Sequence, residues 1–133
     1  GMTTVLERAM TDHDGYTRSF TRMCFKTPPC QEDEDWVSTE MKKLPPYIAF
    51  ALYNDFLFLD YTVTLTKINI PLLIGCADSP AIPSGIAMGR HYRDLVKGKC
   101  FFHEFQDLGH VMFLEDPQQF NETILRFTEC YSE

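Results

Sequence analysis

The sequence lacks both an excess of basic residues and any long hydrophobic run, and each absence excludes a class of partner. Of 133 residues, 12 are Lys or Arg and 19 are Asp or Glu, which gives a formal net charge of −7. An acidic chain without a basic stripe repels a phosphate backbone, so nucleic acid is not an expected partner. The apolar stretches are much shorter than the roughly 20 residues of a transmembrane helix, so a membrane is not expected either.

The cysteines lack the paired spacing of a disulfide framework or a redox motif. There are five of them, an odd number, scattered as Cys24, Cys30, Cys76, Cys100 and Cys130. Scattered cysteines without a secretory leader are typical of reduced thiols, so we expect a cytoplasmic protein.

The sequence also lacks the ligand spacing of a zinc site. His103 and Glu104 are followed by His110, but no two histidines stand four residues apart on a predicted helix, and His103 falls in a predicted strand. We therefore expect neither a metal nor a cofactor.

What is present is an aromatic-rich globular composition, 44% apolar with eleven Phe and six Tyr. Residues 1–65 are predicted to form helices, separated by breaks at Asp12–Gly15, Pro28–Pro29 and Pro45–Pro46. The acidic run Glu32–Asp35 is expected to be a solvated helix start, with Trp36 beyond it in the core. The last of these helices, Tyr47–Leu59, is apolar nearly all round, which is typical of a helix sandwiched between layers.

Residues 66–133 follow a different pattern. Two apolar strands, Ile70–Gly75 and Lys99–Phe105, are predicted around a helix of about residues 84–96, with the first strand buried on both faces. A final helix begins with Asp116 as N-cap and Pro117 as its first residue. A strand–helix–strand–helix order implies a parallel pair with a right-handed crossover, so the expected fold class is α/β.

Two ionisable residues follow these strands. Asp78 comes after the first strand and His110 after the second. Because parallel strands end at the same edge of a sheet, the two side chains are expected to meet there. The carboxylate would then orient the imidazole and stabilise its charged form when it acts as a base. The alternative for Asp78 is a loop aspartate that bonds to nearby backbone, and Cys76 beside it is expected to be a packing residue.

The order of several short motifs gives a more specific indication. They are Ile68-Asn69-Ile70-Pro71, Gly75-Cys76-Ala77-Asp78 with Pro83, Gly109-His110, and Glu115-Asp116-Pro117-Gln118-Gln119-Phe120-Asn121. This ordered set resembles the C-terminal part of the α/β-hydrolase superfamily. The resemblance implies that Asp78 is the catalytic acid and His110 the catalytic base. It also implies that residues 1–65 are a helical lid with its return helix and that residues 66–133 are part of the hydrolase core.

The nucleophile elbow of that superfamily, Gly-x-Ser-x-Gly, does not occur in the sequence. Gly85-Ile86-Ala87-Met88-Gly89 has the spacing, but its centre is Ala87, and we interpret the run as helix packing. We therefore expect a truncated hydrolase-like protein that is inactive alone and hydrolyses an ester or similar bond only if another chain supplies the nucleophile. The alternative is a non-enzymatic module that binds a small apolar ligand or oligomerises. In either case an incomplete sheet predicts a homo-oligomer, most simply a dimer.

Overall fold

The computed structural model describes residues 2–131, without the side chains of residues 2–6 and Leu57. The chain divides into two compact units. One contains the chain up to Met23 together with Pro28–Leu59, and the other contains Cys24–Thr27 together with the chain from Asp60 onward. The short segment Cys24–Thr27 thus belongs with the C-terminal part, although the sequence before and after it belongs to the helical unit.

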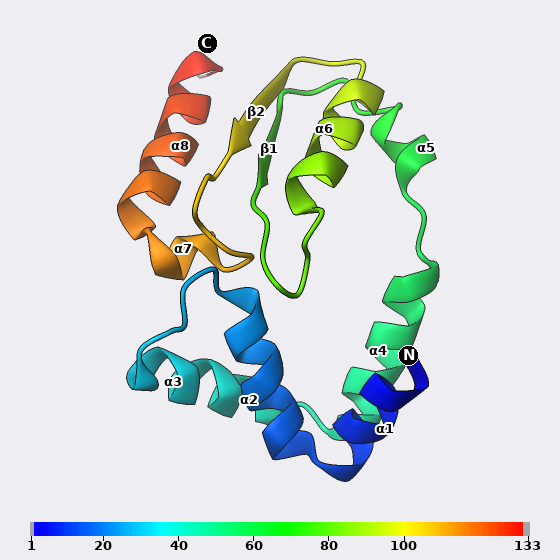
Figure 1. The fold of residues 1–133 in the computed structure, drawn as a ribbon. Coiled ribbons are helices and arrows are strands. Elements are labelled where there is room, and N and C mark those ends of the chain that lie inside the picture. Colours follow the sequence, from blue (N-terminus) through cyan, green and yellow to red (C-terminus); the bar gives the residue numbers. More distant parts are fainter. Residues whose placement is uncertain (1, 132–133) are drawn as a thin grey trace. The chain divides into compact units, whose positions relative to one another are not determined.

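The first unit consists of helices α1 (Met2–Thr11), α2 (His13–Cys24), α3 (Gln31–Lys42) and α4 (Pro46–Phe58) (Figure 1). The break expected over Asp12–Gly15 is confined to one residue, because the Asp12 carboxylate accepts a hydrogen bond from the Gly15 N–H at 3.0 Å. This is an N-cap interaction, and it lets α2 begin at His13 with Gly15 inside the helix. Helix α4 begins at Pro46, one residue before the expected Tyr47, and ends at Phe58, one residue before the expected Leu59.

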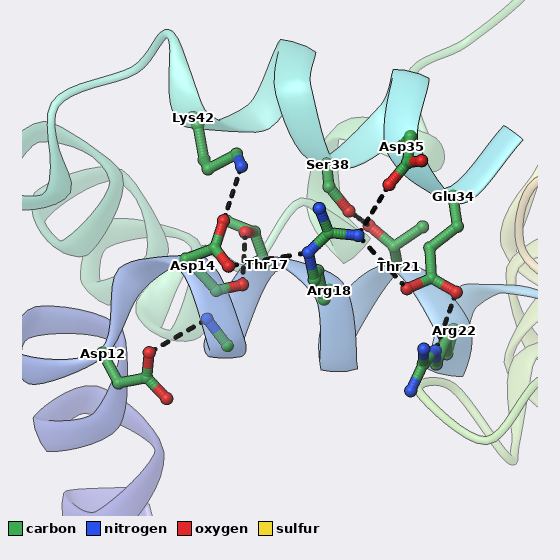
Figure 2. Close-up of polar contacts among 11 residues, drawn as sticks. Asp12, Asp14, Thr17, Arg18, Thr21, Arg22, Glu34, Asp35, Ser38 and Lys42 are labelled. Carbon is green, nitrogen blue, oxygen red and sulfur yellow. Dashed lines mark hydrogen bonds and ion pairs between the residues drawn. The ribbon is translucent and has the colours of Figure 1, made fainter. Parts of the chain in front are cut away.

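Helices α2 and α3 pack through small polar side chains. Thr17, Thr21 and Ser38 are buried, and the hydroxyl groups of Thr21 and Ser38 lie 3.4 Å apart. Ion pairs flank this contact, as Figure 2 shows, among them Arg18 with Asp35 at 2.7 Å. Hydroxyl groups that pair with one another can be buried at little cost, and Met41 of α3 also contacts Thr21, with 3.7 Å between its sulfur and the Thr21 hydroxyl oxygen.

The acidic run at the start of α3 is not uniformly solvated, contrary to expectation. The Glu34 side chain is only 6% exposed, and its carboxylate lies 2.8 Å from Arg22 and 3.6 Å from Arg18. Glu34 lies on the face of α3 that packs against α2, where the two arginines compensate its charge. The carboxylate in turn raises the pKa of Arg22.

Helix α4 and Trp36 are more exposed than the sequence suggested. Trp36 is 56% exposed and Phe58 is 77% exposed, and most large side chains described on α4 are exposed as well. The main contact of α4 is with α1, so the expectation of a helix sandwiched between layers is wrong for the described residues. No helix in residues 2–131 is long and apolar enough to cross a membrane.

The second unit contains α5 (Thr62–Leu65), β1 (Leu72–Cys76), α6 (Gly85–Leu95), β2 (Cys100–Glu104), α7 (Met112–Glu115) and α8 (Pro117–Cys130). Strands β1 and β2 pair in parallel, from Leu72 opposite Cys100 to Cys76 opposite Glu104. This confirms the α/β fold class and the parallel pair. The one-turn helices α5 and α7 were not expected.

Helices α6 and α8 cover opposite faces of the two strands (Figure 1). Phe101 and Phe105 of the second strand segment contact Phe127 and Phe120 of α8. Phe102, one position along, lies beneath Arg93 of α6, with 5.0 Å between the guanidinium and the ring centroid. This alternation is the two-residue period of a strand, and it makes the unit a three-layer α/β/α arrangement.

Strand β1 is less buried than expected. Its first three residues are half-buried, Gly75 is exposed and only Cys76 is buried. The reason is that the described sheet has two strands, so β1 pairs with β2 along one edge only. An apolar sequence typical of a central strand therefore lies at a sheet edge.

Candidate functional site

The carboxyl ends of β1 and β2 lie beside each other, as their parallel register requires. A cavity of about 250 Å³ lies at the end of β1, and its lining includes Cys76, Ala77, Tyr92 and His110. The structure thus brings the predicted base to the end of the neighbouring strand. This edge of a parallel sheet is where binding sites of α/β proteins usually form.

His110 combines an exposed side chain with a fixed backbone. Its N–H donates a hydrogen bond of 2.7 Å to the carbonyl oxygen of Cys24. Between β2 and His110 the chain turns through Asp107, whose φ of 61° lies in the left-handed region that aspartate tolerates better than most residues. The imidazole is therefore reachable from solvent while its main chain is held in place.

Gly109, which precedes His110, occupies a position with no room for a side chain. A Cβ there would lie 2.5 Å from the Cys24 oxygen, 2.5 Å from the Lys26 nitrogen and 2.7 Å from a carboxylate oxygen of Glu115. Two of these three atoms belong to backbone, which moves less easily than a side chain. The glycine of the Gly-His pair noted in the sequence is thus explained by its close packing against the segment Cys24–Thr27.

Glu115, at the end of α7, is the supporting residue that sequence reasoning missed. Its carboxylate accepts hydrogen bonds from the N–H groups of Gly109 (2.5 Å), Lys26 (2.8 Å) and Thr27 (3.3 Å). The motif Glu115-Asp116-Pro117 was apparent in the sequence. However, its donors lie as far as 89 positions away, so no local pattern could identify them.

Asp78 interacts with the start of α6. Its Oδ1 accepts a hydrogen bond of 2.8 Å from the N–H of Ile86, which matches the alternative of an aspartate bonded to nearby backbone. The hydrogen bonds of the described residues do not join Asp78 to His110. Their pairing as acid and base therefore stays a prediction.

A salt bridge places positive charge on the same side of the sheet as Asp78. Arg90 of α6 contacts Glu104 of β2 through two hydrogen bonds of 2.6 and 2.8 Å. The pKa of Arg90 is raised chiefly by Glu104, with a smaller contribution from the charge of Asp78. Arg90, which is charged at any physiological pH, therefore lies within electrostatic range of the Asp78 carboxylate.

Cys76 is a packing residue, as expected. It is buried beneath Gly89 of α6, where an added Cβ would lie 2.6 Å from its sulfur atom. Burial raises the pKa of the Cys76 thiol, with smaller contributions from Glu104 and Asp78. A thiol held neutral in this way is a poor nucleophile.

The residues around His103 do not form a metal site. His103 stacks edge-on against Phe105 on the α8 face, with ring centroids 4.5 Å apart, whereas Glu104 points to the α6 face. Burial, and secondarily the charge of Arg126, lower the pKa of His103. Within residues 2–131 no group of three or more His, Cys, Asp or Glu side chains has the geometry to hold a metal ion.

Comparison with known proteins gives similarity in structure but not in sequence. No family model matches the chain, and no curated protein matches it. It is similar to an esterase from Exiguobacterium antarcticum, with a TM-score of 0.85 and 17% identity over 96% of this chain. It is also similar to a protein assigned as an aryl esterase from Burkholderia cenocepacia, with a TM-score of 0.68 and 22% identity over 95% of this chain.

The chain spans 47% of the length of each of these two esterase structures. At such low identities the likeness shows the fold alone. The chain therefore has the α/β fold of about half of an esterase.

Proposed function

We propose that this chain is the acid–base half of an esterase-type hydrolase, with His110 as the general base and Asp78 as its orienting acid. In this function the imidazole of His110 removes the proton from a nucleophilic hydroxyl group as that group attacks the ester carbonyl. The same imidazole then returns the proton to the departing alcohol. The substrate would be an ester or similar compound with a small apolar group.

The observation that carries the proposal is the location of His110. Its side chain is exposed and lines the cavity at the end of β1, while its N–H is fixed by Cys24. A catalytic base needs both properties, since it must reach substrate and be held in one orientation. The likeness in fold to two esterases supports the same conclusion.

The role of Asp78 in this function requires its second oxygen. Oδ1 is bonded to the N–H of Ile86, a contact that fixes the carboxylate at the start of α6. Oδ2 would accept the hydrogen bond from the imidazole of His110. Since catalytic hydrogen bonds are often long in the absence of substrate, a small rotation of either side chain on assembly is compatible with the proposal.

The nucleophile in this proposal comes from a segment outside the present sequence. The one glycine-x-x-x-glycine run, Gly85–Gly89, has alanine at its centre, and packing explains both of its glycines. A Cβ at Gly85 would lie 2.1 Å from the Ala77 oxygen, and one at Gly89 would contact Cys76. These glycines let α6 approach β1, so the run has a structural reason unrelated to catalysis.

The proposal is tested by hydrolysis of p-nitrophenyl acetate, measured for the chain alone and mixed with the polypeptide encoded directly upstream. We expect activity only in the mixture, and we expect His110→Ala to abolish it. His91→Ala is the matched control, because His91 is an exposed histidine on α6 away from the cavity lining. Activity in the mixture that His91→Ala and His110→Ala reduce equally would contradict the role of His110. Labelling of the chain alone by a fluorophosphonate would instead contradict the proposal that the nucleophile comes from another segment.

We also propose that the chain associates with a second copy of itself when no other segment covers its apolar surface. Support comes from the exposed apolar side chains of α4 and from the unpaired edge of β1. Apolar surface left in water costs about 25 cal/mol per Å², and an unpaired strand edge offers N–H and C=O groups to a partner. A module that only oligomerises or binds a small apolar ligand is the alternative function, and it predicts no dependence of any hydrolysis on His110.

A further inference from the structure

The carboxylate of Glu115 is bonded to backbone rather than to any cation among the described residues. It accepts three N–H groups, from Gly109 before the proposed base and from Lys26 and Thr27 in a segment remote in sequence. Ionised acceptors form the stronger class of hydrogen bond, so this carboxylate links the two segments firmly.

The segment to which Glu115 links His110 is itself anchored. Phe25 is 3% exposed and Cys24 is buried, so this stretch is held in the second unit by apolar burial. The Cys24 oxygen accepts the N–H of His110. The backbone at His110 is thus fixed by two successive N–H groups, one bonded to Cys24 and the other, that of Gly109, bonded to Glu115.

Glu115 is not required for the helix that follows it. The N-cap of α8 is Asp116, whose Oδ1 accepts the N–H of Gln119 at 2.9 Å. The first turn of α8 therefore has its acceptor without Glu115. The described hydrogen bonds of the Glu115 carboxylate all join the backbone of Gly109 to the backbone of Lys26 and Thr27.

We infer that Glu115 is a positioning residue, which holds the backbone of His110 against the segment Cys24–Thr27 so that the imidazole projects to the cavity in a fixed orientation. This inference rests on the proposed function of His110. A displacement of about 1 Å in a reacting group can reduce a rate about a hundredfold. Glu115 would therefore affect the rate of hydrolysis without touching substrate.

The hydrogen bond between Gly109 and Glu115 can be observed directly by NMR in the unsubstituted chain. A hydrogen bond from the Gly109 N–H to the Glu115 carboxylate predicts a long-range HNCO correlation between the Gly109 nitrogen and the side-chain carboxyl carbon of Glu115. In Glu115→Gln the one remaining carbonyl oxygen is uncharged and cannot serve both Gly109 and the pair Lys26 and Thr27, so this correlation should weaken and the Gly109 amide should exchange with solvent about tenfold faster. Glu122→Gln is the matched control, because Glu122 lies exposed on α8 and accepts its hydrogen bond from the side chain of Gln118 rather than from Gly109, Lys26 or Thr27.

The catalytic consequence is measured in the mixture of chain and upstream polypeptide. Glu115→Gln should lower kcat for p-nitrophenyl acetate by about tenfold to a hundredfold with KM unchanged, whereas Glu122→Gln should change neither. Absence of the correlation in the unsubstituted chain, or kinetics of Glu115→Gln equal to those of Glu122→Gln, would overturn the role of Glu115 alone. A correlation that is present while hydrolysis does not depend on His110 would instead overturn the proposed function, and the positioning role with it.

Discussion

Replacing Gly109 with alanine adds one methyl group at the most crowded point beside the proposed base. The new Cβ would lie 2.5 Å from two backbone atoms and 2.7 Å from the Glu115 carboxylate. Separations this short require the segment Cys24–Thr27 to move away. That movement stretches the hydrogen bonds by which His110 and Glu115 hold this segment.

Two contributions determine the expected loss of stability. Overpacking a well-filled position costs about 1–3 kcal/mol. Weakening one or two hydrogen bonds adds about 1 kcal/mol each. We therefore expect Gly109→Ala to lower the free energy of unfolding by about 2–5 kcal/mol, a large part of the roughly 5–15 kcal/mol typical of a folded domain.

The assay is urea unfolding followed by far-UV circular dichroism, together with hydrogen exchange of the β1 and β2 amides. Gly98→Ala is the control, since its Cβ would lie 3.1 Å from the Ile68 oxygen and 3.3 Å from the Ile70 oxygen. Neighbours at these distances need shift only by tenths of an ångström, so the control should lose much less stability. Equal losses for the two variants would refute the packing explanation of Gly109.

Three further outcomes are expected. Glu34→Gln should destabilise the helical unit by about 1–3 kcal/mol, because it removes the charge of a buried carboxylate that accepts a hydrogen bond from Arg22. The measurement is urea unfolding followed by Trp36 fluorescence, in which Glu32→Gln, at an exposed position, should have a smaller effect. Burial raises the pKa of Cys24 from 9.0 to about 11. At pH 8 its reaction with iodoacetamide should therefore be about a hundredfold slower than that of an ordinary thiol. Because the folded state favours the neutral thiol, the stability that comes from burying it should be lost as pH rises from about 9 to about 11. Exposed Cys30 is the internal reference, and equal labelling rates would contradict this result. Light scattering at micromolar concentration should give about twice the 15.4 kDa of one chain, and a mass of one chain would contradict the proposed dimer.

Local signals predicted much of the fold. The start of α8 was apparent from Asp116 and Pro117, and the structure confirms the cap through Gln119. The parallel pair followed from two apolar runs separated by a helical one. The cap depends on residues three positions apart, and each strand and helix is apparent from its own run of residues, so the order of these runs predicts how the two strands pair.

Features that depend on distant residues were missed or wrongly interpreted. Glu34 was assigned to a solvated run, because its partner Arg22 lies on another helix. Helix α4 was expected to be covered, because its composition is that of a sandwiched helix, and composition does not say whether the covering layer is present. Glu115 was part of a recognised motif, but its donors Lys26 and Thr27 come from the far end of the chain.

The central claim is that Asp78 and His110 act as one acid–base pair, and a double-mutant cycle tests it most directly. The kcat for p-nitrophenyl acetate would be measured in the mixture of chain and upstream polypeptide, for Asp78→Asn, for His110→Ala and for the double variant. If Asp78 acts through His110, Asp78→Asn should reduce kcat by as much as about 10⁴-fold on its own and have no further effect when His110 is alanine. Effects of the two substitutions that simply multiply, or an Asp78→Asn variant as fast as the unsubstituted chain, would contradict the pairing.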